Sequence, residues 1–472
     1  MVALLLAACS GGGTGGGSGS GSATSGGASG AGPVTAPPLR AGAAVYDLTP
    51  GTGVPLAGFG GAPRRRLNAV TIPLHLLAFA GTCLDPDPSD AATLFERAQG
   101  VHDPITARAL VLERGARRFA IVSLDVIGIN RGFRDDVAAR LGALGIAAED
   151  LVLLATHTHS GPGAISTMKL WQLIAVDCLH RATYEHMVQG TAEAVARAVA
   201  ALEPAEIGIG RGQEPRAVRN RRGRPQALDP KLDVIKVVRP DGSPIAAVIH
   251  YAIHGTCLGP SNLLLSADVA GAACRELEQR LGGGVAVFAN GAEGDVSPAD
   301  GGFAGAQRDG EQIAETAHAV WQATATTATA ELDAQLVYVR TPAPVFNTGC
   351  FPVPGTGTDI CSLIPGFSIA IALDPSWLPD ELPFQALRIG EDVIVTVPGE
   401  PITEEGWAIE AAGRALGWRR VLVFGLANDY MGYVATEARY LAGDYEGQST
   451  VYGPQTDRFV LEAARARMRD LR

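Results

Sequence analysis

Two histidines stand two positions apart where an apolar stretch, Leu151–Ala155, runs into a glycine-rich turn. The sequence there reads THTHSGPG and places His157 and His159 just after the stretch. In an extended strand the side chains of residues i and i+2 point to the same face, so we expect both imidazoles on one side. Neutral imidazole is a common zinc ligand, and a second imidazole beside it can act as a general acid or base. The pair therefore favours a metal or catalytic site over two histidines that only hydrogen-bond.

A third histidine and a glutamate follow other apolar stretches in the same way. His254 begins an HGT turn, and Glu400 ends the tripeptide PGE. Two histidines, one glutamate and a further oxygen donor form a chemically reasonable zinc set with one position open to water. Spacing alone does not select these ligands from nine histidines and many carboxylates. His250 lies inside the apolar run before His254 and is interpreted as a hydrogen-bonded core residue.

A glycine-rich loop, NGAEGDVSP, presents Asp295 and Ser297. Glycines let backbone N–H groups approach a ligand closely, and Ser297 could donate to an oxyanion or act as a nucleophile. An ordinary Asp/Ser turn explains the same residues. Further along, GLANDYMGY brings Tyr430 and Tyr433 to the end of another apolar stretch, and YEGQST begins with Tyr445.

Apolar runs of strand length alternate with amphipathic stretches of helical length. We predict strands at Phe119–Val126, Leu151–Ala155, Ala246–His250, Val285–Ala289, Val393–Val397 and Val421–Phe424. We predict helices at Arg134–Leu144, Tyr184–Ala201, Val269–Leu281, Ala306–Ala323 and Glu404–Leu416. This alternation is typical of an α/β fold with a mixed, largely buried β-sheet flanked by helices. The region Thr341–Pro375, rich in Pro and Gly and without a clear period, is expected to be a long surface loop.

The composition excludes several classes of protein. The chain has 472 residues, of which 47% are hydrophobic, and a formal net charge of −11. Nucleic-acid binders normally show a basic face, which this sequence lacks, so we expect no nucleic-acid partner. No apolar run approaches the about 20 residues that span a bilayer. At roughly 100–200 residues per domain the length allows two or three domains or one large α/β unit, and we assign residues 41–472 to a single large catalytic domain.

The N-terminus resembles the end of a bacterial lipoprotein signal. Residues 1–8, MVALLLAA, are apolar and directly precede Cys9, although the basic residues that usually open such a signal are missing. Such signals are cleaved before a cysteine that then carries lipid. Residues 10–40 begin with a Gly/Ser-rich stretch, which we expect to be a flexible tether. We therefore expect a lipid anchor at Cys9 that attaches the protein to the bacterial cell envelope, on its periplasmic or extracellular face. A disordered tail with a chance cysteine is the alternative.

The other six cysteines permit three disulfides in an exported chain. Cys350 and Cys361 are the most plausible pair, because they close a Pro- and Gly-rich loop that has few other means of holding its shape. No two cysteines lie in a C-x-x-C arrangement, so a thiolate zinc site is not indicated.

Several motifs occur together and in order: THTHSGPG (156–163), HGT (254–256), GDVSP (294–298), PGE (398–400), GLANDYMGY (425–433) and YEGQST followed by YGP (445–454). Together they resemble the amidase domain of the neutral, non-lysosomal ceramidases, over roughly residues 41–460. The resemblance implies a zinc-dependent amide hydrolase whose substrate is an N-acyl lipid such as ceramide. The family usually carries a further C-terminal β-sandwich domain, whereas this sequence ends soon after YGP, so we expect a version without that domain.

The resemblance also implies roles for individual residues. The zinc ligands would be His157, His254, Glu400 and Tyr433. The residues that contact the substrate or move protons would be His159, Arg221, Ser297 and Tyr445. The twelve-residue step from Tyr433 to Tyr445 agrees with the family pattern and favours Tyr433 over Tyr430 as a ligand. One zinc ion in such a site lowers the pKa of water towards about 7.

Two departures from the family leave the substrate open. Arg222 stands where the family usually has a serine after Asn-Arg, and the 341–375 region is unlike those associated with lipid entry. Zinc amidase chemistry is therefore better supported than ceramide itself. The alternatives are a hydrolase of the same fold acting on another amide or ester, and a non-catalytic surface lipoprotein. The four expected ligand positions all carry residue types that can bind zinc, which counts against the non-catalytic lipoprotein. The sequence indicates nothing about the oligomeric state.

Overall fold

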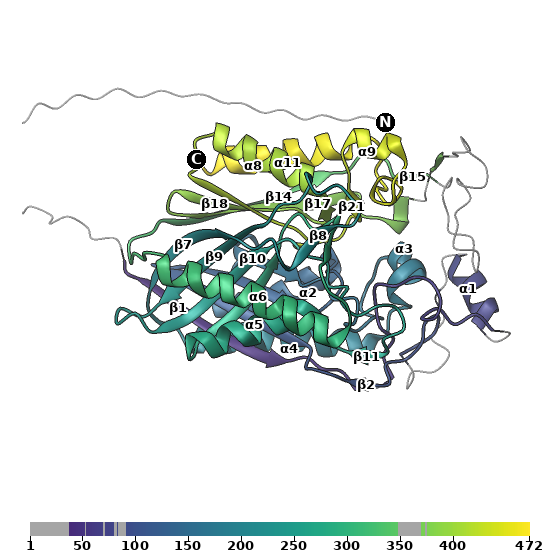
Figure 1. Cartoon of the computed structure of the whole chain (residues 1–472), viewed down its shortest axis with the longest axis horizontal. Helices are drawn as coiled ribbons and strands as arrows, with labels where there is room; N and C mark the ends of the chain where they lie inside the picture. The colour runs from purple at the N-terminus through teal and green to yellow at the C-terminus, as the bar shows by residue number, and fades with distance from the viewer. Residues whose placement is uncertain are drawn as a thin grey trace, which may run out of the picture. The chain divides into compact units, whose positions relative to one another are not determined.

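Three β-sheets, each covered on one face by two helices, make up most of the folded chain (Figure 1). The computed structural model describes residues 37–51, 53–68, 71–79, 83, 91–347, 370–372 and 375–472. Residues Pro37–Arg472 form one compact unit. The mixed α/β class is confirmed, with the strands divided among several sheets. Leu39 and Arg40, which we assigned to the tether, are the first residues of a strand.

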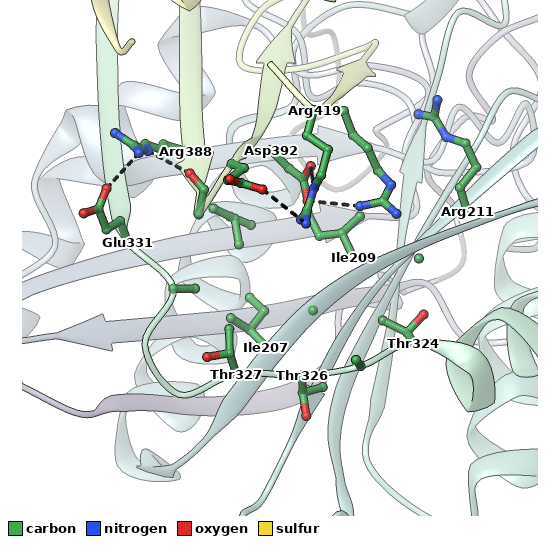
Figure 2. Close-up of a pocket in the computed structure, with 18 of the residues that line it drawn as sticks. Ile207, Ile209, Arg211, Thr324, Thr326, Thr327, Glu331, Arg388, Asp392 and Arg419 are labelled. Atoms are coloured by element: carbon green, nitrogen blue, oxygen red, sulfur yellow. Dashed lines mark hydrogen bonds and ion pairs between the residues drawn. The ribbon is translucent and has the colours of Figure 1, made fainter. Parts of the chain in front are cut away.

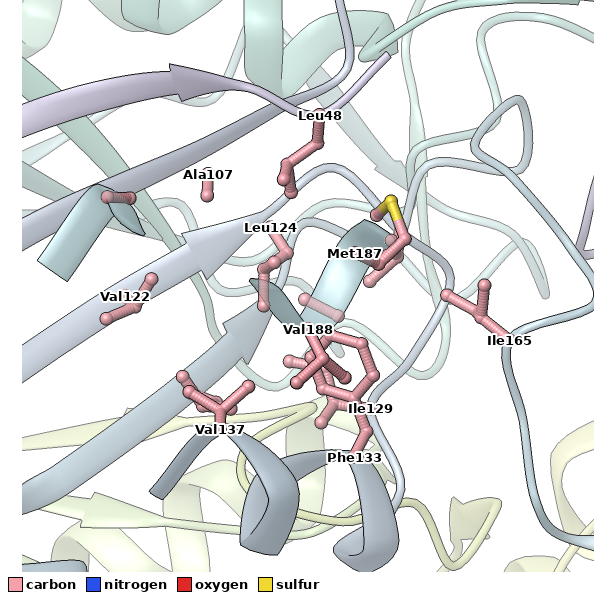
Figure 3. Close-up of a cluster of buried hydrophobic side chains, with 14 of the residues drawn as sticks. Leu48, Ala107, Val122, Leu124, Ile129, Phe133, Val137, Ile165, Met187 and Val188 are labelled. Carbon is pink, nitrogen blue, oxygen red and sulfur yellow. The ribbon is translucent and has the colours of Figure 1, made fainter. Parts of the chain in front are cut away.

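The first sheet has the strand order β5–β4–β3–β1–β6. Its strands are β1 (Leu39–Asp47), β3 (Thr106–Arg114), β4 (Arg117–Leu124), β5 (Leu151–Ala155) and β6 (Glu203–Pro204). The helices that cover it are α2 (Arg131–Leu141) and α4 (Arg181–Ala200). Figure 3 shows their contact, in which Val122 and Leu124 of β4 face Val137 of α2 and Val188 of α4. This apolar layer fixes β5, and with it the position of the THTH motif.

The second sheet has the order β12–β10–β9–β7. Its strands are β7 (Glu206–Gln213), β9 (Lys231–Val238), β10 (Pro244–Tyr251) and β12 (Val285–Asn290). The covering helices are α5 (Asp268–Leu281) and α6 (Gly302–Ala323), which pack through side chains such as Leu277 and Ile313.

The third sheet has the order β14–β17–β18–β20. Its strands are β14 (Leu332–Arg340), β17 (Glu381–Ile389), β18 (Asp392–Thr396) and β20 (Arg420–Phe424). The helices α8 (Thr403–Ala415) and α11 (Thr456–Asp470) lie across it (Figure 1), with Ile409 and Val460 packed against Phe384.

The three sheets also share one interior. Ile121 of β4, Val248 of β10 and Phe424 of β20 belong to the same hydrophobic cluster. Each sheet is therefore buried on both faces, by this cluster on one side and by its helices on the other. Strands buried on both faces read as continuous apolar runs rather than as an alternation. That is why β12, with the sequence VAVFAN, was recognisable as a strand.

Each sheet contains one parallel pair, and the motifs follow the carboxyl ends of these pairs. The pairs are β4/β5, β10/β12 and β18/β20. Two pairs of short strands tie the motif-bearing segments together: β19 (Glu400–Pro401) with β21 (Tyr433–Val434), and β8 (Val218–Asn220) with β13 (Val296–Pro298). Open α/β sheets commonly bind ligands beyond the carboxyl ends of parallel strands, and the three ends converge here.

Shorter elements of the described chain include α1 (Thr71–Phe79), β2 (Gly100–Val101), α3 (Lys169–Trp171), β11 (Leu264–Leu265), α9 (Glu437–Ala442) and α10 (Tyr445–Gln448). Among the helices in the described ranges, none is both long and apolar enough to cross a membrane.

One expectation needs correction, and another falls on residues that the structure does not describe. The region predicted as a loop contains a strand pair, β15 (Val345–Asn347) with β16 (Ala370–Ala372), whose three-residue strands are too short to show a period. Cys350 and Cys361 lie outside the described residues, as does Cys9. Cys83 is bonded to Cys178, whereas Cys257 and Cys274 are free thiols buried in the core under α5. One of the disulfides that six cysteines permit is therefore present in the described part of the chain, and the pairing of Cys350 with Cys361 stays a prediction.

Candidate metal centre and active site

His157 is presented by a turn rather than by the strand itself. Strand β5 ends at Ala155, and His157 has a left-handed backbone with φ of 66°. Its N–H donates to the carbonyl of Val126 at 3.0 Å, and its Nδ1 lies 2.6 Å from the carbonyl of Ile127. A carbonyl only accepts, so Nδ1 carries the proton, and the lone pair of Nε2 points away into the centre. The two imidazoles do lie together, with their Nε2 atoms 3.3 Å apart, but the reason that we gave was wrong, because a turn and not an extended strand places them.

His254, which follows β10 of the second sheet, is held by two backbone carbonyls in the same way as His157. Its N–H donates to the carbonyl of Val296 at 3.1 Å, and its Nδ1 lies 2.9 Å from the carbonyl of Glu293. The GDVSP segment thus supports His254 through its backbone. As in His157, the Nε2 lone pair is the free one, because Nδ1 must donate to the carbonyl.

Glu400 brings a carboxylate oxygen between the two imidazoles. Its Oε2 lies 3.3 Å from Nε2 of His157 and 3.2 Å from Nε2 of His254. All three residues are buried, and within the described chain Oε2 makes no hydrogen bond. Three acceptor atoms that face one another in a buried space repel each other unless a cation lies among them. The atoms that sequence analysis selected therefore fit a metal ion.

The charges of this group are consistent with that fit. Burial alone would raise the pKa of Glu400, but His157 and His254 outweigh it and hold that pKa well below its ordinary value. Burial, together with the charge of Arg221, lowers the pKa of His254 to about 4. His254 is therefore neutral at pH 7, the form that binds metal, and a cation among these groups would supply the positive charge that keeps Glu400 ionised.

Tyr433 and Arg221 stand beside this group. The Tyr433 hydroxyl lies 3.2 Å from Nε2 of His254 and accepts a hydrogen bond from Nη2 of Arg221 at 3.0 Å. Nη1 of Arg221 is itself 3.2 Å from Nε2 of His254. Tyr433 reaches this position because β19 and β21 pair Glu400 directly with Tyr433. Nitrogen, carboxylate and phenol oxygen donors thus converge from all three sheets.

Tyr430, the tyrosine that we did not select as a ligand, has a different contact. Its hydroxyl donates a hydrogen bond to Oε1 of Glu400, the oxygen that faces away from the imidazoles. The Tyr430 hydroxyl therefore orients the carboxylate of Glu400 and is not one of the atoms that would bind the metal.

His159 faces the same centre from one side. Its Nε2 is 3.3 Å from Nε2 of His157, and the Phe59 ring packs 4.7 Å from its own. Burial, with the neighbouring His157 and His254, holds the pKa of His159 well below its ordinary value. The imidazole is therefore neutral at pH 7 and able to accept a proton.

Tyr445 and Ser297 lie at different depths. Tyr445 begins α10, is 52% exposed, and its ring lies 5.5 Å from that of Tyr433. Ser297 is half-buried on β13, next to the residue that supports His254. In the described ranges no hydrogen bond joins the Ser297 hydroxyl to the metal-binding candidates.

Asp295, singled out with Ser297, is a structural residue. Its carboxylate accepts hydrogen bonds from the N–H and hydroxyl of Thr403, at 2.9 and 2.8 Å, and from the Asn220 amide at 2.7 Å. It fastens the loop to α8 and β8. His250 is also structural, as expected, since its Nε2 contacts the carbonyl of Val423 at 2.8 Å in the core.

Sequence reasoning missed Glu293 and Glu446. Glu293 is fully buried, and neither of its carboxylate oxygens has a hydrogen-bond partner among the described residues. Burial, followed by the charge of Glu400, raises the pKa of Glu293 well above its ordinary value. Glu446 accepts a 2.7 Å hydrogen bond from Nε of Arg221. Their positions beside Gly294 and Tyr445 were visible in the sequence, but their burial was not.

A cavity of about 770 Å³ lies at the opposite ends of these strands (Figure 2). Asp392 and Arg420, the first residues of β18 and β20, line it, whereas the histidines follow the carboxyl ends. Its arginines are paired with carboxylates: Arg388 with Glu331 at 2.8 Å and Arg419 with Asp392 at 2.6 Å. The cavity is therefore separate from the metal-binding candidates, and its arginines already have carboxylate partners.

Comparisons with known proteins point to one family. The family model for the N-terminal part of neutral/alkaline non-lysosomal ceramidases matches residues 91–335 and 362–462. A neutral ceramidase of Pseudomonas aeruginosa is 29% identical over 446 residues, which cover 77% of this chain and 66% of that protein. A neutral ceramidase of Mycobacterium tuberculosis is 26% identical over 457 residues, which cover 76% of this chain and 70% of that protein. The chain spans about two thirds of the length of these relatives.

The fold is also that of a solved structure. The crystal structure of neutral ceramidase from Pseudomonas aeruginosa superposes with a TM-score of 0.74 at 25% identity. The superposition covers 92% of this chain and 74% of that chain, so the expected single large α/β unit is confirmed.

Proposed function

Because the chain belongs to the neutral/alkaline non-lysosomal ceramidase family, we propose that it is a zinc-dependent amidase that cleaves an N-acyl lipid into a fatty acid and an amine. Ceramide is the first candidate substrate. The observation that carries the proposal is the convergence of His157 Nε2, His254 Nε2 and Glu400 Oε2, with Oε2 3.3 and 3.2 Å from the two nitrogens.

One zinc ion would be held by His157, His254, Glu400 and Tyr433. Two imidazoles, a carboxylate and a further oxygen are a donor set that zinc accepts, with room for water or substrate. When bound, zinc polarises a carbonyl and makes water a stronger acid.

The chain's own residues supply positioning and proton transfer. Arg221 and Tyr445 flank the centre and hold the amide with the carbonyl oxygen towards them. His159, neutral and with Nε2 facing the centre, takes a proton from the attacking water. The same nitrogen then returns that proton to the amine as the C–N bond breaks, so that water is added across the amide.

Ser297 is given an orienting role. Its place beside the support of His254 suits a hydroxyl that contacts the substrate. An acyl-serine route is not supported, because no described residue forms a hydrogen bond to the Ser297 hydroxyl as a general base must.

The alternatives differ in substrate and in chemistry. A hydrolase of the same fold that prefers another amide or an ester would release fatty acid from that compound and not from ceramide. A non-catalytic binding protein would lack stoichiometric zinc and would release fatty acid from neither.

The test is hydrolysis of a short-chain fluorescent ceramide by the full chain. We expect activity that a chelator abolishes and zinc restores, with one zinc per chain by elemental analysis. Zinc-loaded protein that releases no fatty acid from a panel of N-acyl amides would overturn the amidase. Full activity in metal-free protein would overturn the zinc dependence.

We also propose that lipid on Cys9 attaches the protein to the bacterial envelope. The support is the LAAC pattern before the Gly/Ser-rich stretch. Cys9→Ser should move the protein from the membrane fraction to the soluble fraction and abolish labelling with a fatty-acid probe. Unchanged fractionation and labelling would overturn the anchor.

A further inference from the structure

Arg222 and Arg221 share one carboxylate at the edge of the site. Nε of Arg222 lies 3.0 and 2.9 Å from the two oxygens of Glu446, and its Nη2 lies 2.9 Å from Oε1. Nε of Arg221 donates to the same Oε1 at 2.7 Å. The Glu446 side chain is only 2% exposed, whereas that of Arg222 is 32% exposed. The carboxylate is buried beneath two guanidinium groups, and one of them reaches solvent.

The charges in this cluster do not balance. Burial works to raise the pKa of Glu446, but Arg222 and Arg221 outweigh it, so the pKa lies below its ordinary value and the group is ionised. Within this cluster one carboxylate faces two guanidinium groups, which leaves one positive charge in excess, because Glu400, the other carboxylate whose charge acts on Arg221, belongs to the proposed metal site. Arg224, the next arginine, does not add to it, because Asp295 and Glu404 pair with it at 3.0 and 2.8 Å.

Arg222 also keeps a donor for a ligand. Its Nε and Nη2 point at Glu446, while Nη1 has no hydrogen-bond partner in the described part of the chain. An arginine that uses one edge to hold its position and leaves another donor free is suited to bind an oxyanion.

Tyr445 connects this charge to the metal-binding candidates. The guanidinium carbons of Arg221 and Arg222 each lie 5.3 Å from the centre of the Tyr445 ring. That ring is 5.5 Å from the ring of Tyr433, and Arg221 contacts both Tyr433 and His254. Arg222 is thus one tyrosine ring away from the proposed zinc ligands and partly open to solvent.

Resting on the proposed function, we propose that Arg222 selects substrates whose amine half carries an anionic group such as a carboxylate, phosphate or sulfonate. The acyl chain of an N-acyl lipid requires apolar surroundings, which this charged, half-exposed rim does not offer. The amine half of the substrate is therefore the part that lies here, with its anion paired to Nη1 of Arg222.

The test compares amides of one acyl chain in uncharged detergent micelles: a ceramide, the same ceramide bearing a 1-phosphate, and an N-acyl amino acid. We expect kcat/KM to be at least about tenfold higher for the anionic amides, the size of one charge-assisted hydrogen bond. Arg222→Gln should bring the anionic-to-neutral ratio close to one, and Arg222→Lys should retain part of the preference.

Arg439→Gln is the matched control. Arg439 lies on the neighbouring α9, where it pairs with Glu404 and Asp444 at 3.6 and 3.9 Å rather than with Glu446. The ratio should be unchanged in this variant, whereas a role of Arg222 limited to holding Glu446 would lower the rates of all substrates equally. Equal rates for anionic and neutral amides in the wild type, or the wild-type ratio in Arg222→Gln, would overturn the proposal.

Two further measurements identify where the anion comes from and whether binding alone depends on Arg222. If anionic detergent speeds hydrolysis of the neutral ceramide through Arg222, the anion comes from the surrounding lipid and the substrate proposal is wrong. Calorimetric binding of sphingosine and sphingosine 1-phosphate needs no turnover, and we expect tighter binding of the phosphate that depends on Arg222. If no amide is hydrolysed, the proposed function is contradicted. The ratio of the two binding affinities still decides the role of Arg222, because it does not depend on turnover.

Discussion

The hydroxyl of Tyr430 donates a hydrogen bond to Oε1 of Glu400. This contact leaves Oε2 as the oxygen that faces His157 and His254. Groups that orient a ligand from behind commonly set metal affinity. Tyr430 therefore matters to the metal centre although it is not among the proposed ligands.

Tyr430→Phe removes this hydrogen bond while keeping the ring. We expect zinc affinity to fall by roughly 10- to 100-fold, because Glu400 is then free to rotate. Competition with a calibrated chelator measures the change. Tyr452→Phe is the control, since the Tyr452 hydroxyl bonds the carbonyl of Pro379 at 2.8 Å, outside the centre. Equal affinities in both variants would contradict the orienting role.

His157→Ala and His159→Ala should separate binding from catalysis. His157→Ala removes a proposed ligand, so we expect loss of both zinc and activity. His159→Ala removes the proposed proton carrier, so we expect full zinc content with turnover lowered by about 10²- to 10⁴-fold. Elemental analysis and fatty-acid release measure the two effects, and His318→Ala on α6 controls for loss of an unrelated histidine. Loss of zinc in both variants would make His159 a ligand.

Ser297→Ala tests the orienting serine. We expect zinc to stay bound and turnover to fall, because the proposed role of the hydroxyl is to contact the substrate and not the metal. Ser243→Ala, in an exposed turn, should leave turnover unchanged. If Ser297→Ala hydrolyses substrate at the wild-type rate, Ser297 has no part in the mechanism.

Sequence patterns predicted where the strands end, but they did not predict which contacts hold the side chains that follow. The runs at β5, β10, β12, β18 and β20 were legible because these strands are buried on both faces. By contrast α11, with the sequence TDRFVLEAARARMRD, shows many charges and was missed. Likewise β14, exposed along part of its length, lacks a continuous apolar run. Its neighbours in the sheet, not its own residues, make it a strand.

The site was predictable at the level of residue types. Histidines followed by glycine-rich turns indicated His157 and His254, and the family resemblance selected Glu400 and Tyr433. The roles of Tyr430 and Glu293 could not be read from the sequence. The first depends on the Glu400–Tyr433 register of two short strands. The second depends on burial of a carboxyl without partners, which only the packed structure reveals.

Glu405 makes stability depend on pH. It is buried on α8, where burial and then the charge of Asp457 raise its pKa from 4.5 to about 8. The unfolded chain loses this proton near pH 4.5 and the folded chain only near pH 8. The contribution of Glu405 to the free energy of unfolding is therefore full below pH 4.5 and is lost as the pH rises to 8, which lowers that free energy by up to about 5 kcal/mol.

Urea unfolding of Glu405→Gln at pH 5 and pH 8 checks this. An amide does not titrate. We therefore expect the free energy of unfolding of Glu405→Gln, relative to that of the wild type, to be higher at pH 8 than at pH 5. Glu462→Gln, whose side chain is 66% exposed, should show no such gain. If the difference in unfolding free energy between Glu405→Gln and the wild type is the same at both pH values, the raised pKa of Glu405 is contradicted.

Gly58 limits the space behind His159. Its backbone has φ of 103°, and a Cβ built there would lie 2.5 Å from Nδ1 of His159. Gly53 has a similar φ of 113° but no atom within 4 Å of such a Cβ. Both substitutions to alanine strain the backbone, but only Gly58→Ala also displaces the imidazole of His159.

We therefore expect Gly58→Ala to lower kcat by the order of 100-fold, since a misplacement of about 1 Å has that effect. Its zinc content should stay at the wild-type value, because the ring of His157 is held by Ile127 and does not touch Gly58. Gly53→Ala should lose stability by a similar amount and keep kcat. Elemental analysis, thermal unfolding and steady-state kinetics on the two variants decide this. Equal loss of kcat in both would mean that strain, and not the position of His159, limits the reaction.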